Sequence, residues 1–223
     1  MVLEVIQREV PSRGIAYLIL RDCPEERLGE ALGKGMDKLK KASSPRVLAA
    51  SLPEGEPLHP GPVGMWRLTP AYDLLRLECP MAGRARAEER LLLRPLKKAS
   101  DDKLYTELMN RAYENTPHAR TLSPADLRRP NHRSGLAYQG DVLVGAYEVD
   151  VSEKTPELIA LAIEPELRRR GLGRTLLRSV LDGLSKTPVC AVTVPSTNTP
   201  ALALLQSEGF TQTGVESSWF EVN

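Results

Sequence analysis

Hydrophobic and polar residues follow one another along the chain in segments that predict an α/β protein. In the first half, "GIAYLIL" (14–20) and "RVLAASL" (46–52) are short apolar runs typical of strands. Between them, residues 24–42 have a helical pattern, with Pro24 and two glutamates in the first turn. A helix between two strands predicts a βαβ unit.

The rest of the first half predicts a loop, two strands and a linker. Residues 53–64 contain four prolines and three glycines, which indicates a loop. "MWRLTP" and "YDLLRLEC" follow as strands that we expect to pair. "PMAGRARAEE" (80–89) is small and polar with no apolar period, as in a linker. We therefore expect an N-terminal α/β region over 1–80, a linker over 81–89 and a second domain over 90–223.

The second half has the clearer pattern. A strand over 90–96 and a helix over 100–115 come first, with Ser100 as the expected N-cap and Leu104, Leu108 and Ala112 along one face. A proline-broken segment with at most one short helix follows, and then "SGLAYQ" and "VLVGAYEVD" predict a hairpin around Gly140-Asp141. The remaining expected elements are a strand over 157–164, a helix over 171–184, a strand over 189–194, a helix over 197–210 and a strand over 215–222.

Composition and charge narrow the class of protein. The net charge is +1 and neither half is strongly basic, which disfavours a dedicated nucleic-acid binder. The three cysteines fit neither a metal site nor a disulfide framework. The first ten residues mix charges into their apolar pattern, unlike a signal peptide, and no apolar run reaches the length of a membrane span. We expect a cytoplasmic protein with no nucleic-acid, membrane or metal partner.

The segment "LAIEPELRRRGLGRTL" (161–176) places three arginines and two glycines between a strand and a helix. The first N–H groups of a helix lack intrahelical partners and the helix dipole adds positive charge there, so this turn predicts an anion site. A P-loop needs lysine where Arg174 stands, and a dinucleotide-binding turn needs a small residue in place of Leu176. Both of these nucleotide sites are excluded. A solvated loop before a helix is the structural alternative.

The turn resembles the pyrophosphate loop of the GNAT N-acyltransferases, in which Gln/Arg-x-x-Gly-x-Gly/Ala follows a strand and opens a helix. Arg168, Gly171 and Gly173 match that pattern, and "NTPALALLQSEGF" (198–210) resembles the family's final Asn-to-Gly-Phe helix. The resemblance covers about residues 90–223. It implies an α/β (α+β) GNAT fold, with a mixed central sheet flanked by helices. For residues 1–80 three interpretations stay open: a degenerate GNAT-like half, a cover over the acceptor site and a dimerisation element.

The resemblance implies that acetyl-CoA, or another acyl-CoA, lies between the strands over 157–163 and 189–194. The first strand would pair with the pantetheine arm like an added strand, and the glycine turn would hold the pyrophosphate. We expect only one or two of the arginines to touch the ligand. Asn198 matches a family residue that contacts the pantetheine, and it also suits a plain N-cap. The implied cofactor-binding residues are Leu161, Ala162, Ile163, Arg168, Arg169, Arg170, Gly171, Leu172, Gly173, Arg174, Thr175 and Asn198.

The implied reaction is attack of an amine on a thioester, which needs a group to take a proton and an N–H group to stabilise an oxyanion. Glu157 matches by position the base glutamate of a histone-acetylating branch of the family, and Glu148 on the adjacent strand is a second candidate. An exposed strand-end carboxylate is the alternative for Glu157. The family's general acid is often a tyrosine, and this chain has Leu205 at that position.

These observations lead to one main hypothesis and two others. The first is an acetyl-CoA-dependent N-acetyltransferase that acts on a small-molecule or peptide amine, as a monomer or homodimer. Leu205 keeps open a catalytically inactive acyl-CoA-binding regulatory module. Nucleic-acid binding by "RRR" and "GRARAEER" is disfavoured by the balanced charge. The resemblance also assigns acceptor specificity to residues 113–133, in which we give the histidines no role.

Overall fold

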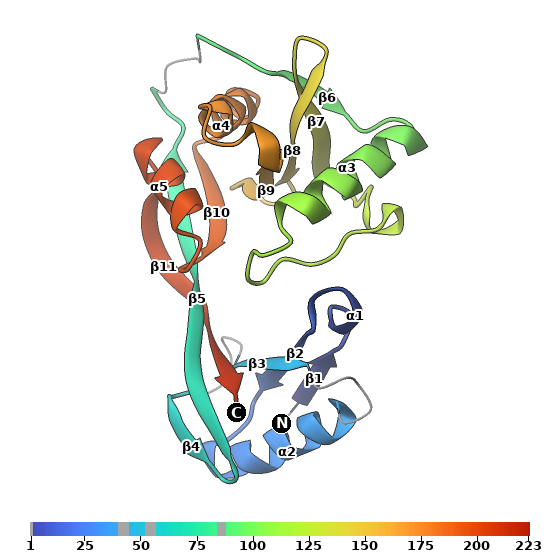
Figure 1. Ribbon diagram of the computed structural model, residues 1–223. Helices are drawn as coiled ribbons and strands as arrows, with labels where there is room; N and C mark the ends of the chain where they lie inside the picture. The colour runs from blue at the N-terminus through green and yellow to red at the C-terminus, as the bar shows by residue number, and fades with distance from the viewer. Residues whose placement is uncertain (1, 40–44, 52–56, 84–87) are drawn as a thin grey trace. The chain divides into compact units, whose positions relative to one another are not determined.

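The computed structural model describes residues 2–39, 45–51, 57–83 and 88–223 (Figure 1). They form two compact units. Unit 1 is built from residues within 1–75, 195–197 and 214–223, and unit 2 from residues within 76–194 and 198–213. Strands β5 (Trp66–Pro80) and β11 (Thr211–Val222) contribute residues to both units.

Unit 1 holds strands in the order β1-β2-β3-β11-β5, with β4 paired to β5. The predicted βαβ unit is confirmed, because β2 and β3 pair in parallel and α2 lies between them in the sequence. The core that α2 forms with apolar residues of these two strands contains Leu28, Ala31, Leu32 and Leu39 of the helix. The elements of this part of the chain are β1 (Val2–Ile6), α1 (Val10–Arg13), β2 (Ile15–Arg21), the 3-10 helix η1 (Glu25–Arg27), α2 (Leu28–Leu39), β3 (Arg46–Ser51) and β4 (Gly61–Val63).

The structure differs from the prediction around β4 and β5. The expected pair of strands over 65–70 and 72–79 is wrong, because β5 runs unbroken from Trp66 to Pro80. Pro70 lacks an N–H group, but its fixed φ still suits an extended chain. The expected loop over 53–64 contains the strand β4, which pairs with the start of β5. Gly64 makes the tight turn between them with a φ of 61°. Residues 52–56 lie outside the described part.

Unit 2 has the strand order β11-β5-β10-β9-β8-β7-β6. Its β10–β9 pair is parallel, and the pairs from β9 to β6 are antiparallel, so the expected mixed α/β class and element order are confirmed. The elements are β6 (Leu92–Pro95), α3 (Ala99–Ala112), the 3-10 helix η2 (Pro124–Asp126), β7 (His132–Gln139), β8 (Val142–Asp150), β9 (Glu157–Ile163), the 3-10 helix η3 (Pro165–Leu167), α4 (Leu172–Asp182), β10 (Val189–Pro195) and α5 (Thr199–Ser207).

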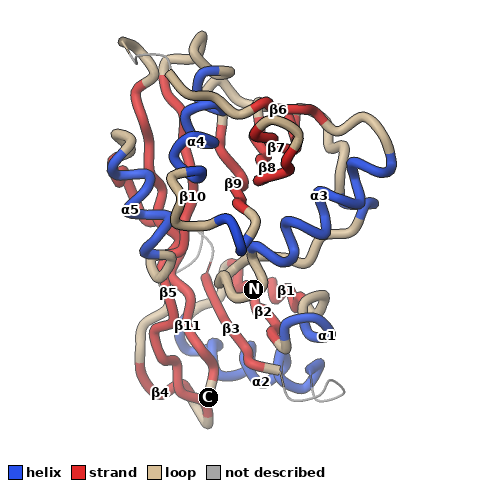
Figure 2. The backbone as a smooth tube through the Cα atoms, turned by 45° about the horizontal axis from the view of Figure 1, so that its top comes forward, coloured by secondary structure: helices blue, strands red, loops and turns tan. Residues whose placement is uncertain are grey.

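Helices cover both faces of the sheet of unit 2 (Figure 2). On one face, Tyr105 of α3 packs with Ala146 of β8. The next residue back along β8, Gly145, faces the other side, where Leu176 of α4 lies. Gly145 is required there, since a Cβ atom would collide with the carbonyl oxygen of Ala162. The β8–β9 pair is thus the packed centre of this unit.

The start of α3 also differs from the prediction. Ser100 lies inside the helix and is not its N-cap. Asp101 instead accepts hydrogen bonds from the backbone N–H groups of Lys97 and Lys98, both at 3.0 Å. These bonds lower the pKa of Asp101. The expected apolar face is partly wrong as well. Leu104 is 41% exposed, whereas Tyr105, Leu108 and Met109 are buried.

Residues 214–223 belong to unit 1, whereas the prediction placed all of 90–223 in one domain. The end of β11 pairs antiparallel with β3, at Phe220–Ala49 and Glu221–Leu48. A linker over 81–89 stays a prediction, and its residues 84–87 lie outside the described part. Within the part of the chain that the structure describes, no helix is long and apolar enough to cross a membrane.

Candidate functional site

Strands β9 and β10 lie side by side for only part of their lengths. They pair at Glu157–Ala191 and Leu158–Val192, and no later pair joins them, although every residue of both strands is described. β9 nevertheless continues to Ile163. The backbone of its second half therefore has no partner strand on the side of β10.

Ile159 explains where the two strands part. β8 pairs with Leu158 and Ala160 of β9 at consecutive positions, so Ile159 is an extra residue without a partner across the pair. Such a bulge bends a strand and increases its twist. The bend follows directly after the last β9–β10 pair, and Ile159 is 44% exposed there.

The glycine turn follows the free half of β9. Gly171 is the N-cap of α4, with a φ of 80° and no capping side chain. A Cβ atom added to it would meet nothing within 4 Å. Among the described residues, no acceptor bonds the N–H groups of Leu172 and Gly173, while those of Arg174 and Thr175 bond the Gly171 carbonyl. The turn thus offers backbone donors and open space, as an anion site requires.

The arginines of the turn have different surroundings. Arg168 is exposed, but its guanidinium donates to the carbonyls of Ile163 at 3.3 Å and Ala112 at 2.7 Å. Arg169 and Arg170 are exposed and bond no other residue that the structure describes. Arg169 also has a φ of 65°. These two guanidinium groups therefore differ from that of Arg168, which two carbonyls of this chain already accept from.

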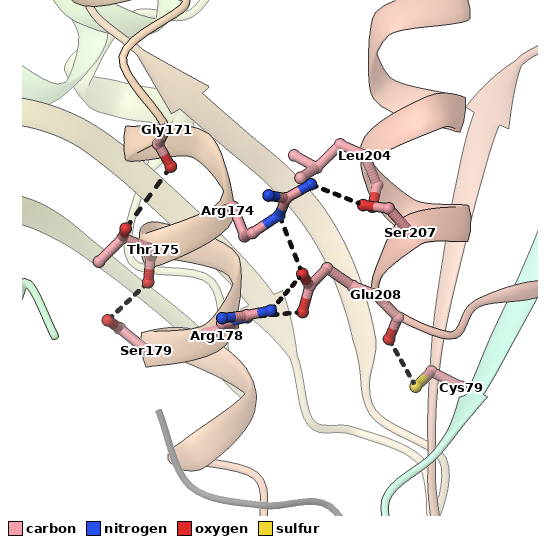
Figure 3. Close-up of polar contacts among 9 residues, drawn as sticks. All are labelled: Cys79, Gly171, Arg174, Thr175, Arg178, Ser179, Leu204, Ser207 and Glu208. Carbon is pink, nitrogen blue, oxygen red and sulfur yellow. Dashed lines mark hydrogen bonds and ion pairs between the residues drawn. The ribbon is translucent and has the colours of Figure 1, made fainter. Parts of the chain in front are cut away.

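Arg174 belongs to a clamp between α4 and the end of α5 (Figure 3). The side chain of Glu208, 3% exposed, accepts from Arg178 at 2.8 and 2.9 Å. Arg174 Nε lies 3.1 Å from the same carboxylate, and its Nη2 lies 3.3 Å from Ser207 Oγ. The clamp holds the Arg174 side chain against α5.

Asn198 is the N-cap of α5. Its side-chain oxygen accepts a hydrogen bond from the Ala201 N–H at 3.4 Å. The capping interpretation of this residue is thus confirmed. Contact with a ligand stays a prediction, and the side-chain NH₂ group is the part that would make it.

Tyr113 lies against the free half of β9. Its hydroxyl accepts a hydrogen bond from the Leu161 N–H at 3.0 Å and donates one to the Leu161 carbonyl at 3.1 Å. Burial raises the pKa of Tyr113, which keeps the hydroxyl protonated and able to donate. The tyrosine immediately follows Ala112, the last residue of α3 and the acceptor of the Arg168 guanidinium.

Glu157 is the first residue of β9 and lies in the short stretch where β9 and β10 still pair, just before the strands part. The hydroxyl of Thr193 in β10 donates to Glu157 Oε1 at 2.8 Å, which holds the half-buried carboxylate at the junction. The carboxylate also borders an open cavity of about 340 Å³ in unit 2. The other residues that line it are Arg76, Asp150, Ser152, Glu153, Lys154 and Thr155.

Glu148, the second candidate base, lies in a buried network instead of an open groove. It is 7% exposed, and Tyr105 donates to Oε2 at 3.2 Å. His132 Nδ1 lies 2.7 Å from Oε1, and its Nε2 lies 3.4 Å from Asp150. Burial and the Glu148 carboxylate raise the pKa of Tyr105. The contacts of Glu148 therefore belong to the face of the sheet under α3.

This geometry can be compared with known proteins. The model of the acetyltransferase (GNAT) family matches residues 99–210, which is half of the chain. The chain belongs to the GNAT family. The predicted resemblance is confirmed, and the matched region runs from α3 past the end of α5, so it contains the residues of the site described above except Arg76.

Other GNAT proteins are similar over parts of their length. The N-alpha-acetyltransferase RimI of Mycobacterium tuberculosis is 34% identical over 102 residues, which are 44% of this chain and 64% of that protein. A mycothiol acetyltransferase of Geodermatophilus obscurus is 28% identical over 167 residues, 66% of this chain and 54% of that one. The chain thus spans between about half and two thirds of these relatives.

Solved GNAT structures share the fold. One from Sphaerobacter thermophilus has a TM-score of 0.61 at 14% identity, over 99% of this chain and 74% of that chain. Another, from Kribbella flavida, has a TM-score of 0.58 at 10% identity, over 93% and 80%. At such identities the likeness concerns the fold alone, and it confirms the predicted fold class.

Two residues of this GNAT site were not singled out from the sequence. Thr193 is the one hydroxyl residue in the apolar run "VCAVTV", and that contrast was the available signal. Tyr113 is the first residue of the segment 113–133, which the resemblance assigns to the acceptor, and the sequence offered no separate reason to select it. Its contact with β9 spans 48 positions of sequence, and no local pattern reveals it.

Proposed function

We propose that this protein transfers an acyl group, in the first place acetyl, from CoA to the amine of an acceptor. The observation that carries the proposal is the free half of β9 leading directly into the glycine turn of α4. A strand edge offers an extended ligand backbone partners for its amide groups, and a helix N-terminus that follows the strand offers a site for its anionic end. Membership of the GNAT family supports the same donor.

The residues present fit an acyl-CoA. The unbonded N–H groups of Leu172 and Gly173 would hold the pyrophosphate, and Arg169 and Arg170 are exposed for a further phosphate. The backbone of Leu161 and Ile163 would pair with the pantetheine amides. The guanidinium of Arg168 already donates to two carbonyls of this chain, those of Ile163 and Ala112. Its part in binding would therefore be to fix the end of β9.

The acyl-CoA supplies the activated carbonyl carbon of the reaction. A bond forms between that carbon and the acceptor nitrogen, and the carbon–sulfur bond breaks. An acceptor that arrives as an ammonium loses two protons from its nitrogen. One is released to solvent and the other balances the proton that joins the sulfur, which gives an amide and free CoA. We assign the first proton transfer to Glu157, which lies where the strands part and borders the open cavity.

The second proton needs no side chain at position 205. Leu205 is 5% exposed, packed in α5, and cannot donate a proton. A thiol has a pKa of about 8.5, so a thiolate is a good enough leaving group to take its proton from water. The same leucine favours the second candidate function, a catalytically inactive acyl-CoA-binding module.

The acceptor class follows from the relatives. They include an N-alpha-acetyltransferase and a mycothiol acetyltransferase, whose names give an alpha-amino group in one case and mycothiol in the other. We propose that the acceptor amine enters through the cavity beside Glu157. Its carboxylates, Asp150, Glu153 and Glu157, would attract a cationic ammonium group.

The test is an acceptor panel with acetyl-CoA. Peptides with different free N-termini and small primary amines are incubated with the protein, and free CoA thiol is followed over time. We expect thiol release that depends on at least one acceptor, with the acetylated amine found by mass spectrometry. Acetyl-CoA binding without release across the panel would support the inactive module instead.

A further inference from the structure

The edge of β9 that faces away from β8 has only a few backbone groups to offer. Groups of alternate residues in a strand point to opposite edges. The N–H of Glu164 donates to Val144 of β8, so Leu161 and Ile163 direct theirs to the other edge. We call the backbone groups of these two residues the free edge of β9.

Side chains of this chain already occupy that edge. The Tyr113 hydroxyl accepts from the Leu161 N–H and donates to the Leu161 carbonyl, which is the pair of bonds that an added strand would make. The Arg168 guanidinium donates to the Ile163 carbonyl. Three of the edge's groups are thus bonded within the protein.

Three consecutive residues at the carboxyl end of α3 bond β9 and the segment that follows it. Arg111 donates to Glu164 at 2.7 Å, Ala112 accepts from Arg168 at 2.7 Å, and Tyr113 bonds Leu161. We call residues 111–113 the latch. Its contacts follow β9 from Leu161 into the glycine turn, along the path that the proposed function assigns to the acyl donor.

We propose that the latch closes the free edge of β9 in the absence of acyl-CoA, and that acyl-CoA binds by displacing the Tyr113 hydroxyl from Leu161. This inference rests on the proposed function, since it assumes that the pantetheine uses the same edge. A protein that must first open binds its ligand more weakly, in proportion to its open fraction. Tyr113 therefore lowers the affinity for the acyl donor.

Calorimetric titration of CoA into the wild type and Tyr113→Phe tests this. The variant keeps the ring but lacks the hydroxyl, so the edge is open, and we expect it to bind CoA about tenfold more tightly, the ratio that one hydrogen bond typically produces. Tyr138→Phe, on β7 with its ring against Arg94, is the matched control and should leave the affinity unchanged. CoA binding to Tyr113→Phe that is no tighter than to the wild type would overturn the latch while leaving the proposed function intact.

Amide hydrogen exchange at Leu161, without any ligand, provides the second measurement. We expect exchange in Tyr113→Phe to be about tenfold faster than in the wild type, because the N–H loses its acceptor. Unchanged exchange would also overturn the latch. If no variant binds CoA, the proposed function fails and so does the latch's role toward CoA, whereas faster exchange would still establish the contact itself.

Discussion

At the scale of single residues, the proposed base Glu157 has one fixed partner, Thr193. An exposed carboxylate at a strand end needs no fixed partner, whereas this one accepts a 2.8 Å bond from Thr193 where the strands part. For Glu157→Gln we expect kcat to fall at least about 100-fold, because the amide cannot take the amine proton. The affinity for acetyl-CoA should stay unchanged in calorimetry.

Glu153→Gln is the control for that variant, since Glu153 lines the same cavity and is exposed. Its kcat should stay close to that of the wild type, and the loss of its attraction for the acceptor ammonium should appear in the KM for the acceptor. Full activity of Glu157→Gln would remove Glu157 from the mechanism and return the assignment of the base to Glu148 or to water.

Thr193 is predicted to position the Glu157 carboxylate. Replacing it by valine removes the hydroxyl at nearly constant volume, so the carboxylate loses its orientation. We expect kcat to drop about tenfold, as for the loss of one hydrogen bond, with the KM for acetyl-CoA unchanged. Thr193→Ser restores the hydroxyl and should recover most of the activity. If serine and valine behave alike, the orienting role is refuted.

The two glycines of the turn are predicted to differ. Gly171 has a φ of 80°, so alanine there is strained by about 1–2 kcal/mol, and the strain falls on the proposed pyrophosphate site. We expect Gly171→Ala to weaken CoA binding about tenfold in titration calorimetry. A Cβ on Gly173 would make only ordinary contacts, 3.5 Å from Leu204 and 3.9 Å from Ile163, so Gly173→Ala should bind normally. Equal affinities for the two variants would contradict this account of the turn.

The sequence predicted well those residues whose role depends on backbone conformation. It predicted poorly those residues whose role depends on which side chain or carbonyl they contact. Gly171 and Asn198 lie where their conformational preferences put them. Arg168 matches the motif and Arg174 follows it, yet partners within this chain hold both side chains, the Ala112 carbonyl for Arg168 and Glu208 for Arg174. Those partners are 56 and 34 positions away, beyond the reach of any local pattern.

At the scale of elements, Glu208 joins α4 to the end of α5 through two arginines (Figure 3). Glu208→Gln keeps the shape of the side chain but removes its charge. We expect the free energy of unfolding in urea to fall by about 2 kcal/mol, the range for hydrogen bonds to charged groups, reduced because the arginines are half exposed. The exposed pair Lys103–Glu107 is the control, and Glu107→Gln should have no measurable effect. A Glu208→Gln protein as stable as the wild type would show that packing alone holds α5.

Element prediction succeeded where one periodicity decides the outcome. The leucines of α4 recur on one face and are buried there, and β2-α2-β3 forms the expected parallel unit. It failed for β5, in which Pro70 lies inside one continuous strand. Pairing supplied by β4, β10 and β11 outweighs one missing N–H group.

At the scale of the whole molecule, the residues of the proposed donor site lie in unit 2. The βαβ unit of unit 1 connects β2 to η1 and α2 through Asp22, Cys23 and Pro24, without glycines. A helix start of that kind offers no open cradle of N–H groups. The assignment of residues 214–223 to unit 1 was not predictable from local patterns. It depends on the pairing of β11 with β3, a strand from the other half of the chain.

The central claim is that an acyl group moves from CoA to an amine. The most direct measurement quantifies two products in one reaction with acetyl-CoA and an accepted amine: free CoA thiol and the acetylated amine. The account predicts that both rise together in equal amounts, and that both fall in Glu157→Gln. Thiol release without an acetylated amine, or neither product across the acceptor panel while CoA binds, would contradict it.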